Sequence, residues 1–491
     1  MENFWDYSVW AGINLIAVLL LSLLLANVLK RKIPWLNASL IPTSVLGGGV
    51  LLVLAGLYKL VCGDVLFDTA FFGGNGMANL EIITYHALAL GFIASTLKAA
   101  KGKLSRKRTV EIFNTGVTTV ATYLLQAVVG LGITIVIAAF FLPDFFPAAG
   151  VLLPLGYGQG TGQALNYGTI YENDWGFVGG KSFGLTIAAL GFLSASIGGV
   201  IHLNILKKKQ KIKTLAGDEG AIVAEDIQQK DEIPMLGSMD KMTVQVAFVI
   251  ISYLVAYLLM FLLGNLLPGM KSVIYGFNFL LGVLSATLVK AVLNLLRKTG
   301  LMHRQYLNDF LMTRISNFCF DIMVVAGIAA IRLGILEKYW GPILILGVVG
   351  LVLTYAFNRL VAVRLFPEYA QEQFLMMYGM LTGTASTGTV LLREIDGEFK
   401  TPAADNMVYQ NLPAIALGFP MMLLATLAPV KPALTMVILV VFFLALQVVL
   451  YTFTRNRVAV TYAHAYDALG GSIDEKPAPA PAAPKNQPWQ Y

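Results

Sequence analysis

The sequence predicts an all-α protein that crosses a membrane many times. Hydrophobic residues make up 57% of its 491 residues and charged residues only 13%, whereas soluble proteins carry about a quarter charged residues. The charges lie between long apolar runs, many of which reach the roughly 20 residues that a helix needs to cross a bilayer. A soluble multidomain protein is therefore excluded. The net charge of +7 does not indicate nucleic-acid binding, because basic cytoplasmic loops produce the same excess.

Eleven apolar segments are long enough to cross the membrane. The first follows the acidic residues Glu2 and Asp6 and precedes the basic run 30–32, so we expect an uncleaved helix whose N-terminus lies outside. In chain order, the expected spans are 7–29, 39–60, 81–97, 112–142, 181–206, 243–266, 271–293, 315–335, 342–363, 405–428 and 432–453.

The distribution of basic residues favours this orientation. With the N-terminus outside, six of the 35 Lys and Arg residues fall on the outer side and the other 29 on the cytoplasmic side. The clusters 98–108, 207–213 and 297–314 occupy every second connection, as the positive-inside rule requires. The C-terminus is therefore expected inside, and the net charge needs no anionic partner to explain it.

Two stretches contain too many glycine and hydroxyl residues for ordinary spanning helices. They are 150–171 (GVLLPLGYGQGTGQALNYGTIY) and 374–392 (FLMMYGMLTGTASTGTVLL). Glycine weakens a helix, and free backbone groups at membrane depth are tolerated only inside protein or along a wet cavity. We expect each stretch to be a re-entrant loop, because a full crossing would move the basic residues after it to the outer side. A ligand can contact backbone at these two places.

The order of these parts predicts two repeats of opposite orientation. Residues 1–206 hold four spans, the loop 150–171 and a fifth span, and residues 243–430 repeat this order with the loop 374–392. Five is an odd number, so the second repeat enters the membrane from the other side, which is typical of secondary transporters. The remaining segments are a polar cytoplasmic linker at 207–242, an additional spanning helix at 431–457 and a Pro-rich, disordered cytoplasmic tail at 458–491.

The first glycine-rich stretch offers bare backbone amides, two side-chain amides and one hydroxyl. These groups can bind a carboxylate through N–H groups or Na⁺ through carbonyl oxygens. The alternative is close helix packing through small residues, although this density of glycine exceeds what packing needs. The candidate ligand-binding residues are Gly158, Gln159, Gly160, Thr161, Gly162 and Gln163.

The second stretch is richer in hydroxyl groups, which can hydrogen-bond a polar substrate or bind Na⁺. The alternative is that these hydroxyls bond back to their own helix. The candidate residues are Thr382, Gly383, Thr384, Ser386 and Thr387. Across both stretches, the expected Na⁺ ligands are Gly160, Thr161, Ser386 and Thr387.

Asp321 is the clearest ionisable residue inside a predicted span, at 315–335, and such residues are costly unless they have a function or a partner. It can pair with a substrate ammonium, bind a cation or take up a proton. The alternative is a structural pair with Arg314 or Arg332, but Arg332 lies eleven residues on, about three helical turns away.

Arg393 closes the second stretch. Its guanidinium group can bind a carboxylate through two parallel hydrogen bonds. Glu394 and Asp396 lie beside it, so an ordinary pair at the membrane interface is the alternative.

At these motifs the chain resembles the sodium/glutamate symporter family, over about residues 8–428. The matching residues are Ile41-Pro42, Val45 and Gly47-Gly48, Gly158 to Gly162, Trp175-Gly176-Phe177, Ser182-Phe183-Gly184, Gly198-Gly199, Gly379 to Thr389 and Leu392 to Asp396. The resemblance implies a dimeric carrier of the bacterial inner membrane that couples Na⁺ entry to glutamate uptake, with two re-entrant loops at the translocation site.

We therefore expect a Na⁺-coupled symporter that imports glutamate or a related small anionic amino acid or carboxylate. Its partners are the solute, membrane lipid and a second copy of the chain, with no nucleic acid and no organic cofactor. Coupling to H⁺ through Asp321 is a variant of this reading. A channel is the first alternative, because glycine-rich loops also form selectivity filters. An enzyme is not expected, because no catalytic set of residues lies at a suitable spacing.

Overall fold

The chain is almost entirely helical. The computed structural model describes residues 3–98, 105–208, 232–233, 239–397 and 399–468, with no strand in these segments. In this part of the chain, ten helices are long and apolar enough to cross a membrane, or eleven if the bent pair near the C-terminus counts as one. This agrees with the predicted class of an all-α, multi-pass membrane protein.

The helices form two sets, one on each side of residues 209–240. The first set is α1 (Tyr7–Lys32), α2 (Pro34–Ala38), α3 (Thr43–Cys62), η1 (Leu66–Asp68), η2 (Ala70–Phe72), α4 (Gly76–Leu97), α5 (Arg106–Phe140), η3 (Pro147–Val151), α6 (Leu152–Tyr157), α7 (Gly160–Trp175) and α8 (Gly180–Lys208). The second set is α10 (Lys241–Leu266), η4 (Pro268–Met270), α11 (Lys271–Gly276), α12 (Asn278–Lys298), α13 (Asp309–Ala329), α14 (Leu333–Leu365), η5 (Pro367–Tyr369), α15 (Ala370–Thr382), α16 (Ala385–Arg393), α17 (Ala403–Tyr409), α18 (Asn411–Leu427) and α19 (Pro432–Ala468).

The start of several helices is fixed by polar caps. The Ser105 hydroxyl accepts a hydrogen bond from the Arg108 backbone at the start of α5, Asp240 caps α10, and the Asn308 side chain accepts one from the Leu311 backbone at the start of α13. Such caps satisfy backbone N–H groups that have no partner within the helix.

The outer helices bury one narrow stripe each. In α1 the buried residues are Ala11, Leu15, Leu19, Ser22 and Ala26, and in α10 they include Gln245, Val249, Ser252, Ala256 and Met260. Both sets follow the spacing of one helix face. Many of the remaining apolar side chains of α1 and α10 are exposed, as expected for helices that face lipid.

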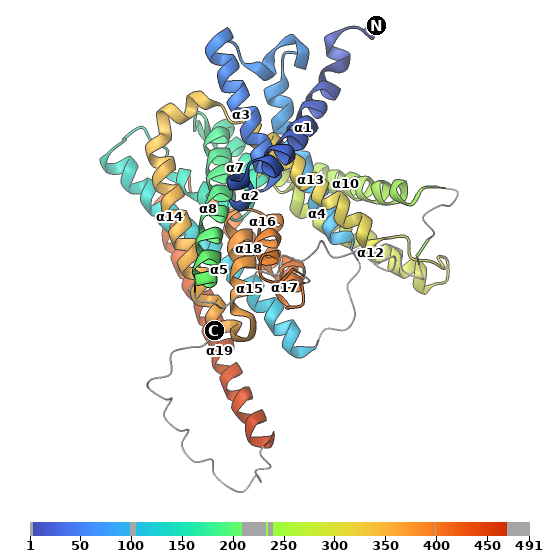
Figure 1. Cartoon of the computed structure of the whole chain (residues 1–491), viewed down its shortest axis with the longest axis vertical. Coiled ribbons are helices and arrows are strands. Elements are labelled where there is room, and N and C mark those ends of the chain that lie inside the picture. The colour runs from blue at the N-terminus through green and yellow to red at the C-terminus, as the bar shows by residue number, and fades with distance from the viewer. Residues whose placement is uncertain (1–2, 99–104, 209–231, 234–238, 398, 469–491) are drawn as a thin grey trace.

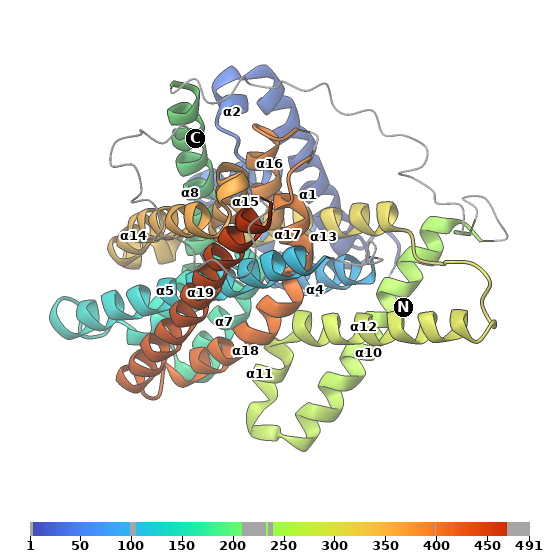
Figure 2. The same ribbon diagram turned by 90° about the horizontal axis from the view of Figure 1, so that it is seen from below.

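Two helices from different parts of the chain form the centre of the packing. α4 packs against α13, α3 packs on α13, and α12 packs on α4, while α1 packs on α3 and α10 on α12. α5 contacts α14, α18 and α19. Figures 1 and 2 show α10 and α12 on the opposite side of the molecule from α14 and α19. All six residues of α6 are buried, so the first glycine-rich stretch lies in the interior.

The two glycine-rich stretches, which we expect to be re-entrant, are mostly helical. In the first, α6 and α7 are interrupted at Gly158 and Gln159, and in the second, α15 and α16 are interrupted at Gly383 and Thr384. A helix satisfies the hydrogen bonds of most of its backbone groups internally, which matters at membrane depth. Only two residues at each break leave the helical pattern.

Two expected spans are broken. The span expected at 271–293 consists of α11 and α12, and Phe277 separates them. The span expected at 405–428 consists of α17 and α18, which meet at an angle of 54°. Pro413 follows this break, and proline has no N–H group to continue the helical hydrogen bonds.

The polar segments also differ from expectation. α19 continues to Ala468, so the chain is still helical at 458, where we expected the disordered tail to begin. Residues 469–491 lie outside the described residues. Most of the linker 207–242 also lies outside them. Within its described part, Glu232 is buried and pairs with Lys241 at 2.7 Å.

Candidate ligand site

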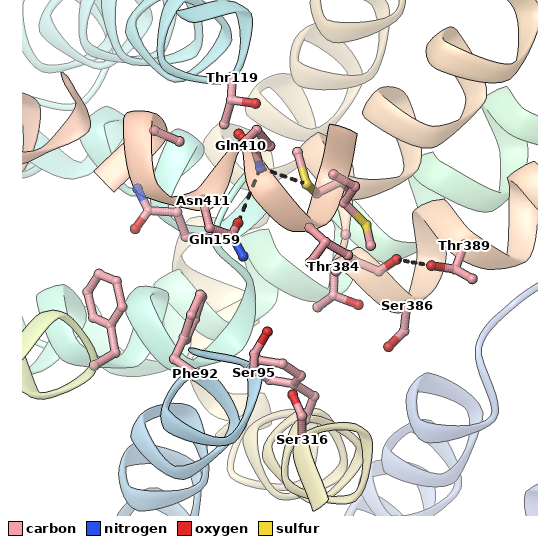
Figure 3. Close-up of a pocket in the computed structure, with 18 of the residues that line it drawn as sticks. Phe92, Ser95, Thr119, Gln159, Ser316, Thr384, Ser386, Thr389, Gln410 and Asn411 are labelled. Carbon is pink, nitrogen blue, oxygen red and sulfur yellow. Dashed lines mark hydrogen bonds between the residues drawn. The ribbon is translucent and has the colours of Figure 1, made fainter. Parts of the chain in front are cut away.

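A cavity of about 580 Å³ lies where the helix breaks meet. Its walls come from α4, α5, α12 and α13, from the breaks between α6 and α7 and between α15 and α16, and from α17 and α18. Figure 3 shows polar side chains of several of these elements pointing into it. Segments far apart in the sequence therefore share one site.

The two glycine-rich breaks lie directly against each other. A Cβ atom added to Gly160 would lie 3.5 Å from the Thr384 Cγ2 atom and 3.8 Å from the Gly383 carbonyl oxygen. Gly160 has a φ of +78°, a left-handed conformation that costs other residues energy. The sequence therefore needs glycine here for the chain to turn into α7 beside the second break.

Side chains of α5 bind the backbone of both breaks. The Tyr123 hydroxyl donates to the Gly158 carbonyl oxygen at 3.0 Å. The Gln126 amide donates to the Leu381 carbonyl oxygen at 3.0 Å and to the Thr354 hydroxyl at 2.8 Å. Carbonyl groups released at a helix break need such donors when they are buried.

Three cationic side chains line the cavity. They are Lys98 at the end of α4, Arg314 on α13 and Arg393 on α16. No Asp or Glu residue lines the cavity in the described chain, and none of the three cations forms a salt bridge there. The net electrostatic field of the lining therefore attracts anions.

Burial affects the charge of one of these cations. Burial lowers the pKa of the Lys98 ammonium below its ordinary value, and the carboxylate of Asp309 partly opposes this shift. The Arg393 guanidinium lies 5.7 Å from the ring centre of Phe399, an arrangement in which the ring face favours the positive charge. Arg393 does not form the alternative pair with Asp396, whose carboxylate accepts hydrogen bonds from the 400–401 backbone.

Much of the cavity lining is apolar. The ring of Phe92 lies 5.2 Å from that of Phe279 and 5.4 Å from that of Phe320, and all three rings line the cavity. Four methionines line it as well, at positions 323, 380, 407 and 422. Methionine is flexible and adapts to ligands of different shape.

Gln163 places a hydrogen-bond donor at the buried end. The Asn166 amide donates to the Gly276 carbonyl oxygen at 3.0 Å and to the Gln163 Oε1 atom at 2.8 Å. The Gly276 carbonyl oxygen can only accept a hydrogen bond, so the Asn166 nitrogen must face it. This fixes the orientation of the Asn166 amide and, through it, that of the Gln163 amide. The Gln163 Nε2 group has no partner among the described residues, and Gln163 lines the cavity.

About half of the predicted site residues line the cavity. They are Gly158, Gln159, Gln163, Gly383, Thr384, Ser386 and Arg393. The others contact protein instead. The Thr161 hydroxyl donates to the Met323 carbonyl oxygen, the Thr382 hydroxyl bonds back to its own helix, and Thr387 forms a capping box with Thr384. Gly162 packs against Leu88 of α4.

The four expected Na⁺ ligands are therefore not gathered around one point. Ser386 faces the cavity, whereas Gly160 faces Thr384 and Thr161 contacts α13. Thr387 serves its own helix start. Asp321 does not line the cavity either; it lies on α13, which packs against α3.

Several lining residues have no strong signal in the sequence. Lys98 and Arg314 belong to basic clusters that the membrane topology already explains. Gln410 and Asn411 had a usable signal, since two polar amides just before a proline interrupt an apolar stretch. Such an interruption is typical of the broken helices that carry transporter sites.

No protein-family model matches this chain, and neither a curated protein nor a solved structure matches it. The features of the cavity that bear on function are the two helix breaks, the three cations and the buried amides.

Proposed function

We propose that this protein is a Na⁺-coupled carrier that imports glutamate or a related small anionic amino acid or carboxylate. The observation that carries the proposal is the composition of one cavity. Two helix breaks from different halves of the chain meet there, and the lining has three cations and no described acid. The cations supply charge for a carboxylate, and the Gln163 amide supplies a directed donor.

The packing of the helices supports two inverted repeats. The proposed correspondence pairs the helices of the two repeats in chain order. It matches α1 with α10, α3 with α12, α4 with α13, α5 with α14, the pair α6 and α7 with the pair α15 and α16, and α8 with α18. The contact of α3 with α13 then matches the contact of α12 with α4, and the contact of α8 with α14 matches that of α18 with α5. Repeats of this kind give a carrier two related conformations.

The cavity favours a carrier that alternates access. Arg314 and Arg393 are exposed at one end, whereas Gln163 and Met422 are buried at the other. The Tyr167 hydroxyl donates to the Met422 carbonyl oxygen and the Tyr171 hydroxyl to that of Ala425, which ties α7 to α18 behind the buried end. In the orientation derived from the basic loops, the exposed end faces the cytoplasm.

The remaining parts of the proposal follow from the resemblance to the sodium/glutamate symporter family. They are a bacterial inner membrane and a homodimer. The proposed orientation, with the N-terminus outside and the C-terminus inside, follows instead from the distribution of basic residues. Entry of one net positive charge releases about 2.3 kcal/mol per 100 mV of membrane potential, which is enough to concentrate a solute.

The test is transport by purified protein in proteoliposomes. We expect uptake of radiolabelled L-glutamate, or of a related dicarboxylate in a competition panel, when a Na⁺ gradient is imposed. Choline replaces Na⁺ in the control. Absence of Na⁺-dependent uptake and counterflow for every acidic solute would overturn the proposal.

A further inference from the structure

A directed chain of hydrogen bonds connects α5, α15 and α17 beside the cavity. The Thr115 hydroxyl donates to the Glu111 backbone carbonyl at 2.8 Å, so its oxygen can only accept from Gln373 Nε2 at 3.2 Å. The Gln373 Oε1 atom must then accept from Asn406 Nδ2, at 3.1 Å. The chemistry of Thr115 thus fixes the orientation of both amides.

This chain leaves the Asn406 Oδ1 atom as an acceptor. The Asn406 Nδ2 group donates to Gln373 and to the Tyr369 hydroxyl, at 3.1 and 2.9 Å. Its Oδ1 atom has no hydrogen-bond partner in the described chain, and the residue is completely buried. A buried acceptor without a donor costs about 1–3 kcal/mol.

A second fixed acceptor lies one turn farther along the same helical face. The Gln410 Nε2 group faces two acceptors, the Met380 sulfur at 3.5 Å and the Asn411 Oδ1 atom at 3.3 Å. Its Oε1 atom therefore points the other way, and it too lacks a partner among the described residues. Gln410 is 2% exposed and lines the cavity.

The third acceptor comes from α5, which packs against α17. The Thr119 hydroxyl has no partner within the described part of the chain, and Thr119 is 1% exposed. Figure 3 shows Thr119 and Gln410 on the same wall of the cavity. Thr119 is four residues beyond Thr115, so both lie on one face of α5.

We infer that the oxygens of Thr119, Asn406 and Gln410 form a binding site for a monovalent cation of the Na⁺ class. The site offers acceptors and no acidic side chain, since Glu111 is paired with Arg108 at 2.7 Å. Divalent cations require carboxylates to offset their dehydration, so neutral oxygens select a single charge. The two amide oxygens can only accept hydrogen bonds, and the Thr119 oxygen has free lone pairs, so all three oxygens can coordinate one cation.

This site differs from the Na⁺ ligands expected at the glycine-rich breaks. It lies on helices α5 and α17, at the wall of the cavity in which we propose that the anionic solute binds. Its role in coupling rests on the proposed function, whereas cation binding itself does not. A cation there adds positive charge next to the solute, so each ligand increases the affinity for the other.

The test is the thermal unfolding of the purified full-length protein in NaCl, with choline chloride added to keep the ionic strength constant. Thr119→Val and Gln410→Met each remove one proposed ligand and keep the side-chain volume. Thr122→Val is the matched control, because its buried hydroxyl bonds back to the Thr118 carbonyl at 2.8 Å.

We expect Na⁺ to raise the unfolding temperature of the wild type saturably, as a ligand of the folded state does. Thr119→Val and Gln410→Met should each raise the half-saturating Na⁺ concentration by about tenfold or more, and Thr122→Val should leave it unchanged. A wild type that responds equally to Na⁺ and choline would overturn the inference. An unchanged half-saturating concentration in both ligand variants would do the same, and these oxygens would then hold water only.

Uptake by the same proteins separates this inference from the proposed function. If Na⁺-driven uptake is present and is equally sensitive to Na⁺ in Thr119→Val, Gln410→Met and the wild type, the carrier remains and the site is wrong. If no acidic solute is transported but the two variants weaken Na⁺ binding, the site remains and the carrier proposal is wrong.

Discussion

The Tyr123 hydroxyl donates a hydrogen bond to the Gly158 carbonyl oxygen, at 3.0 Å, where α6 ends. Three residues farther along α5, Gln126 donates to the Leu381 carbonyl oxygen just before the second break. One turn of α5 therefore holds both breaks. A side chain at position 158 would overlap the Tyr123 ring, so a ring at position 123 requires glycine at position 158.

Tyr123→Phe should destabilise the protein by about 1–2 kcal/mol, because it leaves the buried Gly158 carbonyl without its donor. The measurement is the unfolding temperature of the purified protein. Tyr257→Phe is the control, since Tyr257 is 48% exposed on α10. Equal unfolding temperatures for the two variants would contradict the role assigned to Tyr123.

Gly160→Ala should destabilise the protein by about 1–2 kcal/mol, because alanine resists the left-handed conformation. The added methyl group would also contact Thr384, so we expect the rate of solute uptake to fall. Gly49→Ala is the control, since a Cβ atom there meets nothing within 4 Å and alanine favours the helix. If Gly160→Ala and Gly49→Ala have the same stability and the same rate of uptake, the contact between the two breaks contributes to neither.

Lys98 should make solute binding depend on pH. Its pKa is lowered by burial, and a lysine is charged below its pKa and neutral above it, so affinity for an anion should fall as the pH rises through this lowered pKa. Lys98→Gln should weaken binding about tenfold at pH 7, a loss of about 1.4 kcal/mol. Lys98→Arg should keep the affinity and remove this part of the pH dependence, because arginine stays charged.

The measurement for Lys98 is the dissociation constant of the solute between pH 7 and 10 in each variant. If the dissociation constant depends on pH in the same way in the wild type and in Lys98→Arg, another group causes the pH dependence. Affinity that Lys98→Gln leaves intact would remove Lys98 from the anion site.

Asp321→Asn should leave Na⁺-driven uptake in place. Asp321 lies on α13 outside the cavity lining, so its carboxylate does not contact a ligand held in the cavity, and asparagine keeps nearly the same shape. The measurement is uptake driven by a Na⁺ gradient and, separately, by a proton gradient. Uptake that needs no Na⁺ and that Asp321→Asn abolishes would favour the proton-coupled variant of the carrier.

The buried pair of Glu232 and Lys241 should be sensitive to the loss of one partner. Their side chains are 2% and 0% exposed, and Asn308 also donates to Glu232 at 2.7 Å. Lys241→Met leaves a buried carboxylate without its cation and should cost about 3–5 kcal/mol. Adding Glu232→Gln to this variant should restore most of the stability.

Unfolding temperature and the yield of monodisperse protein measure this effect. A single variant as stable as the wild type would show that the linker residue Glu232 does not anchor the segment to α10. A double variant less stable than Lys241→Met would contradict the explanation by charge.

The position of the breaks was predictable from local chemistry, and the assembly of the site was not. Glycine and hydroxyl residues weaken a helix wherever they cluster, so 150–171 and 374–392 stand out in the sequence. The side that Asp321 faces depends on which helices surround α13, and helical periodicity does not contain that information. The same holds for Lys98, Arg314 and Arg393, which meet only through the packing of α4, α13 and α16.

The attachment of α5 has a consequence for synthesis of the protein. Gln126 finds its partners 228 and 255 residues farther along the chain, so they do not yet exist when α5 enters the membrane. A side-chain amide without a partner in hydrocarbon costs several kcal/mol. Until the second half of the chain is made, α5 therefore holds an amide whose partners in the folded protein are missing, and its stable placement depends on completion of the chain.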